Sequence, residues 1–221
     1  MESYTTPTKV RLELCTLCQL NCRDCYMRRS ESNYCGVGKG YVTFDLFKRF
    51  VEMNPFVEFI ETSNSGEIFL NPDLKKILEY AFHKKIALAA YNGCNLNSLS
   101  DELAEALVKY QFRGLTVSID GASQEVYAAY RRNGNFNNVI NNIRKINRYK
   151  EKYNSIYPNL GWQYVVMDTN DDIHEIQKAK ELANELKMQI FFKETWNQNY
   201  IPKNIEQIKC ETGVDYSYRQ G

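Results

Sequence analysis

The chain has 221 residues and a mass of 25.9 kDa, which fits one α/β domain with a sizeable core. Its 28 Lys and Arg balance 27 Asp and Glu, so it lacks the basic field that dominates nucleic-acid binding, and we expect no nucleic-acid partner. No apolar run approaches the roughly 20 residues of a membrane span, and the N-terminus shows no apolar signal core, so we expect no membrane partner and a cytoplasmic location.

Short apolar runs alternate with amphipathic segments along the chain. The apolar runs predict strands at residues 10–14, 56–61, 86–91, 114–119, 162–167 and 188–192. The amphipathic segments predict helices at residues 43–53, 72–83, 101–110, 124–131, 136–152 and 172–186. Thr43 and Ser100 are the predicted N-caps of two of these helices. This alternation indicates a parallel sheet with right-handed crossovers.

The positions of the polar motifs favour a barrel over a doubly wound sheet. Motifs come directly after strands at residues 18–25, 64–67, 92–93 and 120–121. In parallel barrels the loops at the carboxyl ends of the strands carry the chemistry. We therefore expect an open, partial (β/α)6 TIM-like barrel of parallel strands over residues 1–193. Residues 194–221 are polar and show no clear periodicity, which predicts a weakly packed C-terminal tail, or the start of a further domain, that does not seal the open side.

Three cysteines at the spacing C-x3-C-x2-C follow the first predicted strand, and Tyr26 closes the motif. In a reducing compartment, seven cysteines favour metal or redox chemistry over disulfides. The thiolates of Cys18, Cys22 and Cys25 are one ligand short for a four-iron cluster and leave one iron open. Adding Cys15 leaves a structural zinc site as an alternative, although the two C-x2-C pairs are close enough to crowd one metal. A buried apolar role is favoured for Cys15.

Two further motifs follow later strands. In the Ser-Gly-Glu motif at 65–67, the glycine permits close backbone approach and the carboxylate suits an ammonium group, while a plain loop turn is the alternative. In the Ser-Ile-Asp-Gly motif at 118–121, Asp120 is placed to accept from ribose hydroxyls, while an Asp-Gly turn is the alternative. Arg131 and Arg132 suit a carboxylate ligand or a solvated helix end.

Taken in order, these motifs resemble the radical S-adenosylmethionine (radical SAM) superfamily from residue 8 to about 193, and most closely the subgroup that often carries a C-terminal SPASM or twitch domain. The resemblance rests on Glu13-Leu14, the C-x3-C-x2-C-Tyr loop, Gly66-Glu67 with Asn71-Pro72-Asp73, Asn92-Gly93, and the stretch from Ser118 to Phe136. The chain departs from the pattern in having Ser65, Asn71 and Tyr91 where Gly, His and Thr are frequent. Cys210 is the only cysteine after Cys94, so the Cys-rich region of SPASM relatives is not represented in these residues.

The resemblance implies a [4Fe–4S] cluster held by Cys18, Cys22 and Cys25, with S-adenosylmethionine chelating the fourth iron through its amino and carboxylate groups. It also implies a set of contacts to S-adenosylmethionine: the backbone near Tyr26 at the adenine, Gly66 and Glu67 at the amino group, Ser118, Asp120 and Arg132 at the ribose or carboxylate, and Ser65 and Asn92 in the same site.

The implied activity is reductive cleavage of S-adenosylmethionine to a 5′-deoxyadenosyl radical that abstracts hydrogen from a substrate. The subgroup favours a peptide or protein substrate, with an electron donor such as flavodoxin or ferredoxin. A glycyl-radical-enzyme activase is an alternative within the family, because it shares the cysteine spacing. A zinc-stabilised binding module without catalysis is the alternative outside it.

Overall fold

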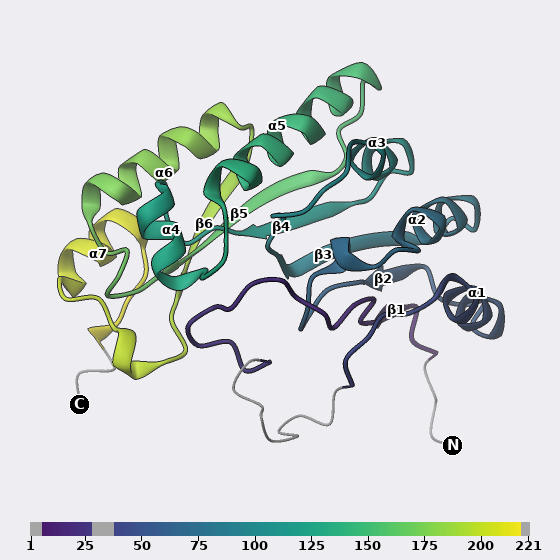
Figure 1. The fold of residues 1–221 in the computed structure, drawn as a ribbon, viewed down its shortest axis with the longest axis horizontal. Helices are drawn as coiled ribbons and strands as arrows, with labels where there is room; N and C mark the ends of the chain where they lie inside the picture. The colour runs from purple at the N-terminus through teal and green to yellow at the C-terminus, as the bar shows by residue number, and fades with distance from the viewer. Residues whose placement is uncertain (1–5, 28–37, 218–221) are drawn as a thin grey trace.

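The computed structural model describes residues 6–27 and 38–217, and its framework is a six-stranded sheet (Figure 1). The strands lie in sequence order, and every neighbouring pair is parallel. Their bounds are β1 Lys9–Arg11, β2 Phe59–Glu61, β3 Ala87–Cys94, β4 Gly114–Ser118, β5 Asn159–Val166 and β6 Gln189–Glu194. Within the described residues β1 and β6 are the two edges of the sheet, so the barrel is open, which confirms the expected α/β, partial (β/α)6 architecture.

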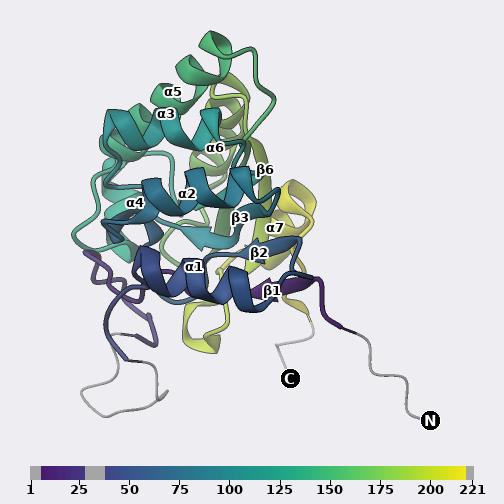
Figure 2. The same cartoon turned by 90° about the vertical axis from the view of Figure 1, so that its right-hand side faces the viewer.

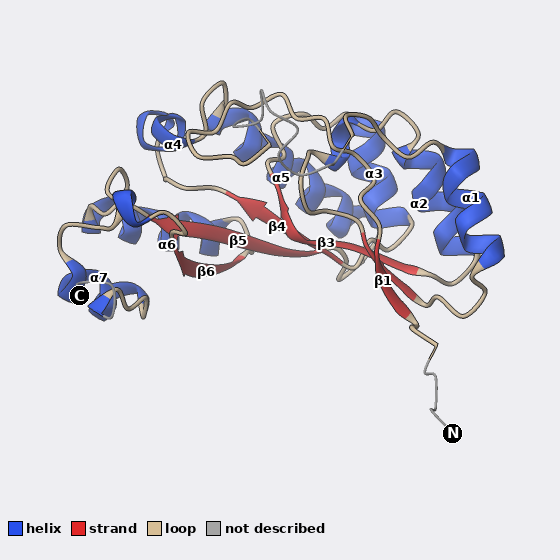
Figure 3. Ribbon diagram, turned by 90° about the horizontal axis from the view of Figure 1, so that it is seen from below, coloured by secondary structure: helices blue, strands red, loops and turns tan. Residues whose placement is uncertain are grey.

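Helices connect the strands and pack against the sheet. Their bounds are α1 Phe44–Met53, α2 Leu74–His83, α3 Asp101–Lys109, α4 Gln124–Tyr130, α5 Phe136–Lys152, α6 Ile173–Glu185 and α7 Ile205–Thr212, with 3-10 helices η1 Ile68–Leu70 and η2 Gln198–Tyr200. Along one face of the sheet, α1, α2, α3 and α5 lie side by side in that order (Figures 2 and 3). In the part of the chain that the structure describes, no helix combines the length and apolar character needed to cross a membrane.

The predicted N-caps explain where two of these helices begin. The Thr43 hydroxyl accepts from the Leu46 N–H at 3.4 Å, and the Ser100 hydroxyl accepts from the Leu103 N–H at 3.1 Å. A side-chain oxygen in this position satisfies one of the N–H groups that the first helical turn leaves free. The two N-cap predictions are therefore confirmed.

Strand β3 differs from the sequence-based prediction, which ended it at residue 91. The strand continues to Cys94 through an irregularity in its register with β4, between Ala90 and Cys94. Gly93 has a φ of +121°, a conformation that residues with a Cβ rarely adopt, so it absorbs the irregularity. Asn92 and Gly93 therefore lie within an irregular strand rather than in a turn that ends it.

The expectation of a weakly packed C-terminal tail is wrong for the described part of residues 194–221. Ile205 and Ile208 of α7 are buried, and helix α7 packs against α6. Tyr216 is fully buried, and its hydroxyl donates to the Val166 carbonyl at 2.8 Å and accepts from the Thr195 N–H at 2.7 Å. The sequence prediction failed because the apolar residues of this segment are few and widely spaced, although Ile205, Ile208, Val214 and Tyr216 are buried against the core. The division of the chain at residue 193 remains a prediction.

Candidate functional site

The cysteine loop, residues 15–27, follows β1 and docks against the end of α4. The Asn21 N–H donates to the Arg132 carbonyl at 2.9 Å, and the Arg23 N–H donates to the Tyr130 carbonyl at 3.0 Å. Cys15, at the start of the loop, is fully buried, as its place in the strand pattern predicted. The docking therefore fixes the middle of the loop against residues about 110 positions away in the sequence.

The thiols of Cys18, Cys22 and Cys25 share this loop and are all partly buried. Burial raises the pKa of Cys18 to about 11, and it also raises the pKa of Cys22. The Cys25 N–H donates to the Cys22 carbonyl at 3.3 Å, which closes a turn between these two cysteines. Within residues 6–27 and 38–217, no group of three His, Cys, Asp or Glu side chains is placed to hold a single metal ion.

Arg131 joins the cysteine loop to the end of β4. Its Nε donates to Asp120 Oδ2 at 2.6 Å, and its Nη1 lies 3.8 Å from Cys22 Sγ in a hydrogen bond. The other Asp120 oxygen accepts from the Val165 N–H of β5 at 2.8 Å, and the Asp120 side chain is fully buried. The positive charge of Arg131 opposes the effect of burial on the pKa of Cys22. Asp120 therefore acts here by holding Arg131 rather than by facing open space.

Asn95 provides a second contact to the cysteine loop. Its Nδ2 donates to Cys18 Sγ at 3.5 Å, and its backbone N–H donates to Glu67 Oε2 at 2.5 Å. Glu67 is fully buried and also accepts from the Phe69 N–H at 3.3 Å. Burial raises the pKa of Glu67 from 4.5 to about 7, against the lowering effect of these N–H donors. Both Glu67 oxygens are thus engaged by the backbone, and its predicted contact to a ligand amino group remains a prediction.

The loop after β2 packs directly on the start of the cysteine loop. A Cβ atom on Gly66 would lie 2.3 Å from the Cys15 carbonyl oxygen, so only glycine fits there. The Tyr26 hydroxyl donates to Ser65 Oγ at 2.5 Å, and the Ser65 N–H donates to Glu13 Oε2 at 2.7 Å. The structure therefore brings together three of the predicted site residues, Tyr26, Ser65 and Gly66.

The remaining predicted site residues lie further along the sheet. Ser118 is buried next to Gly93, where an added Cβ would lie 2.9 Å from Ser118 Oγ. Asn92 is exposed and donates through Nδ2 to the Ser63 carbonyl at 2.9 Å. Arg132 is also exposed, and its carbonyl contributes to the docking of the cysteine loop. Of the two neighbouring arginines, Arg131 is the one whose side chain reaches a cysteine.

The sequence analysis did not identify Asn95, and of the two arginines it placed Arg132 rather than Arg131 in the site. Asn95 directly follows β3, which is the position at which a polar side chain of a parallel barrel serves a site. Arg131 is the C-cap of α4, a position that hydrophobic periodicity does not orient. Asn95 could have been identified from the sequence if the end of β3 had been predicted correctly. The role of Arg131 became visible only when the structure docked the cysteine loop against α4.

The segment around η2 also contacts the cysteine loop. The guanidinium of Arg23 stacks over the Tyr200 ring at 4.2 Å from its centroid, and Asn197 Nδ2 donates to Asp24 Oδ2 at 3.0 Å. The chain after β6 therefore reaches the loop that carries the cysteines, which the sequence-based prediction of a loose tail did not anticipate.

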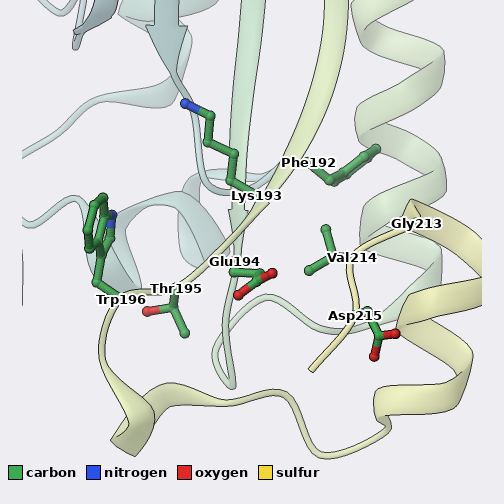
Figure 4. Close-up of a pocket in the computed structure, with 8 residues that line it drawn as sticks. All are labelled: Phe192, Lys193, Glu194, Thr195, Trp196, Gly213, Val214 and Asp215. Carbon is green, nitrogen blue, oxygen red and sulfur yellow. The ribbon is translucent and has the colours of Figure 1, made fainter. Parts of the chain in front are cut away.

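A cavity of about 540 Å³ lies at the end of β6 (Figure 4). Phe192, Glu194, Val214 and Asp215 are among its lining residues, while the Lys193 ammonium points away from the two acidic side chains. This cavity is therefore a feature of the junction between β6 and the C-terminal segment.

Comparison with known proteins gives a family and a fold. A family profile described as Radical SAM superfamily matches residues 12–178. SuiB of Streptococcus suis bound to S-adenosylmethionine has a TM-score of 0.70 at 12% identity, with 93% of this chain and 46% of that chain covered. SuiB bound to the precursor peptide SuiA has a TM-score of 0.61 at 13% identity, with 85% and 39% covered. The structure of anSMEcpe with S-adenosylmethionine and the Kp18Cys peptide has a TM-score of 0.65 at 15% identity, with 88% and 56% covered.

At these identities the solved structures show the fold alone, and this chain spans about half of their length. No curated protein sequence matches the chain significantly. The family profile covers more than half of the 221 residues and includes the cysteine loop as well as the end of α4. Membership implies S-adenosylmethionine and a [4Fe–4S] cluster as cofactors. The chain therefore belongs to the radical SAM superfamily of enzymes.

Proposed function

We propose that this chain is the catalytic core of a radical SAM enzyme in which Cys18, Cys22 and Cys25 bind the [4Fe–4S] cluster. The observation that carries the proposal is the setting of the three thiols. They share one loop, and Arg131 and Asn95 each direct an N–H donor at one of the sulfurs. Such donors favour the thiolate form that binds iron and orient it.

The residues present fit both cofactors. Burial disfavours thiolates at Cys18 and Cys22, so a cationic iron centre is the partner that would stabilise them. Beside this loop, Glu13 Oε1 is buried and has no hydrogen-bond partner within the described residues. Buried carboxylate oxygens normally have a partner, and the ammonium group of S-adenosylmethionine is a ligand group that would supply one.

The two cofactors, when bound, supply radical chemistry that removes a hydrogen atom from a substrate. The chain contributes the shape of the site. Gly66 lets the loop after β2 approach the cysteine loop, and the Tyr26–Ser65 hydrogen bond holds the two loops together. We propose that this junction binds S-adenosylmethionine, with Ser118 and Arg132 on the ribose or carboxylate side, and that Asp120 contributes to the site by holding Arg131.

We propose a peptide or protein as substrate and a SPASM- or twitch-like relationship as the subgroup. Support comes from the folds of SuiB and anSMEcpe, two proteins whose solved structures include peptides. A flavodoxin or ferredoxin in the cytoplasm is the proposed electron donor, because the cluster needs one electron for each cleavage.

The test is anaerobic reconstitution of the chain with iron and sulfide, followed by metal analysis and an assay for 5′-deoxyadenosine under a strong reductant. We expect about four irons and four acid-labile sulfides per chain, an EPR signal after reduction, and 5′-deoxyadenosine formed from S-adenosylmethionine. Purification of the chain with stoichiometric zinc and without sulfide would contradict the proposal and favour the zinc-stabilised binding module.

A further inference from the structure

We propose that Arg131 and Asn95 are positioning residues for the cluster ligands, and that their hydrogen bonds to Cys22 and Cys18 raise the reduction potential of the cluster. This inference rests on the proposed function, because it assumes that the cysteines bind a cluster. It concerns the electron-accepting step, which must precede any chemistry on the substrate.

The contact of Arg131 with Cys22 is fixed from both sides. Backbone hydrogen bonds from Asn21 to Arg132 and from Arg23 to Tyr130 flank the pair, so Cys22 and Arg131 face each other between them. The guanidinium is held at its other end by the buried carboxylate of Asp120, and Arg131 itself is only 16% exposed. The rigid, planar guanidinium can therefore direct Nη1 at the sulfur without losing its ion pair.

The amide of Asn95 is oriented by its own hydrogen bonds. Its Oδ1 accepts from the Asn97 N–H at 2.9 Å and from Gln19 Nε2 at 3.0 Å. An amide whose oxygen is engaged by a backbone N–H must present its NH2 group on the opposite side, where Cys18 Sγ lies at 3.5 Å. Asn95 is buried, so water does not replace this donor easily.

Hydrogen bonds to cluster sulfurs are one of the means by which a protein sets cluster potential. Reduction adds negative charge to the cluster and its sulfur ligands, and a donor stabilises the more negative state more strongly. A charged donor has a larger effect than a neutral one. Arg131 should therefore contribute more than Asn95, and the two should shift the potential in the same direction.

The experiment is a redox titration of the reconstituted chain without S-adenosylmethionine. The EPR signal of the reduced cluster measures the fraction reduced at each potential. The variants are Arg131→Gln, Arg131→Lys and Asn95→Ala. Arg144→Gln is the control, because it removes the same charge from an exposed ion pair between Arg144 of α5 and Glu185 of α6. Omitting S-adenosylmethionine ensures that a lost contact to that ligand cannot cause a shift.

We expect Arg131→Gln to disfavour reduction at least tenfold, which is about 59 mV toward lower potential for one electron. Asn95→Ala and Arg131→Lys should shift the potential in the same direction by less, and Arg144→Gln should match the wild type. The inference would be overturned if all cluster-loaded variants had the same midpoint potential as the wild type. If Arg131→Gln takes up no iron, the Asn95→Ala and Arg131→Lys titrations decide by the same criterion. A wild-type chain that forms no iron–sulfur cluster would instead contradict the proposed function.

Discussion

Cys22 and Arg131 face each other between two backbone hydrogen bonds, although 109 residues separate them in the sequence. The loop that carries the cysteines is thus held by the end of α4, and the charge of Arg131 is balanced by Asp120. A substitution at Arg131 should therefore affect the cysteine loop, and a substitution in the cysteine loop should affect the end of α4.

The cysteines differ in their expected roles. Alanine at Cys18, Cys22 or Cys25 should each abolish cluster assembly, because each change removes one of only three ligands. Cys15→Ala should retain the cluster and lower stability, because it removes a fully buried side chain. Iron and sulfide content after reconstitution measures the difference, with the buried Cys94→Ala as a control. Loss of the cluster in Cys15→Ala, with Cys94→Ala unaffected, would revive a four-cysteine site.

Gly66→Ala should displace the cysteine loop. The added Cβ would lie 2.3 Å from the Cys15 carbonyl oxygen and 2.6 Å from the Thr16 carbonyl carbon, and backbone atoms cannot move aside cheaply. We expect a loss of stability of about 1–3 kcal/mol or more and weaker binding of S-adenosylmethionine. Gly38→Ala is the matched control, since nothing lies within 4 Å of its added Cβ. Equal unfolding midpoints and equal ligand affinities for the two variants would show that the packing at Gly66 does not matter.

Asp120→Asn should destabilise the fold, because it leaves the charge of Arg131 unpaired in a largely buried position. Breaking such a pair costs about 3–5 kcal/mol when the remaining charge is buried. Glu185→Gln breaks the exposed pair with Arg144 and should have little effect. Urea unfolding of the wild type, Asp120→Asn and Glu185→Gln checks this prediction. Similar small losses of unfolding free energy in the two variants would mean that water or another group replaces Asp120 as the partner of Arg131.

The pKa of Glu67 predicts a pH dependence of stability. This pKa is about 7 in the folded chain and 4.5 in the unfolded chain, so the folded state binds more protons between these values. The free energy of unfolding should therefore fall as pH rises from 4.5 to 7, by roughly 3 kcal/mol at about 1.4 kcal/mol per pH unit. Glu67→Gln should remove this component. The measurement is a set of unfolding curves of the metal-free chain from about pH 4.5 to about pH 8, with Glu185→Gln as an exposed control. If Glu67 stays ionised throughout, the wild type and Glu67→Gln will show the same dependence of unfolding free energy on pH.

Tyr200→Ala should loosen the cysteine loop from the segment after β6. It removes the ring that lies 4.2 Å from the Arg23 guanidinium, a contact that contributes about 0.5–1 kcal/mol at an exposed site. We expect faster loss of iron to a chelator, by about two- to fivefold at that energy. Tyr153→Ala removes an exposed ring far from the loop and should keep the wild-type rate. A wild-type rate in Tyr200→Ala would show that η2 does not restrain the loop.

The alternation of strands and helices, the bounds of α5 and the N-caps at Thr43 and Ser100 could be predicted from the sequence. These features depend on neighbours a few positions apart, and side-chain periodicity records them directly. The cysteine spacing is equally local, so the candidate ligands were visible before any fold was known.

The tertiary structure alone decided how the side chains near those ligands are used. It turned the Glu67 carboxylate toward the backbone at Asn95, directed Arg131 rather than Arg132 at a cysteine, and packed Tyr216 into the core. The physical reason is distance along the chain. Cys18 meets Asn95 across 77 positions and Asp24 meets Asn197 across 173, and no local periodicity records which side chains meet when two remote loops dock.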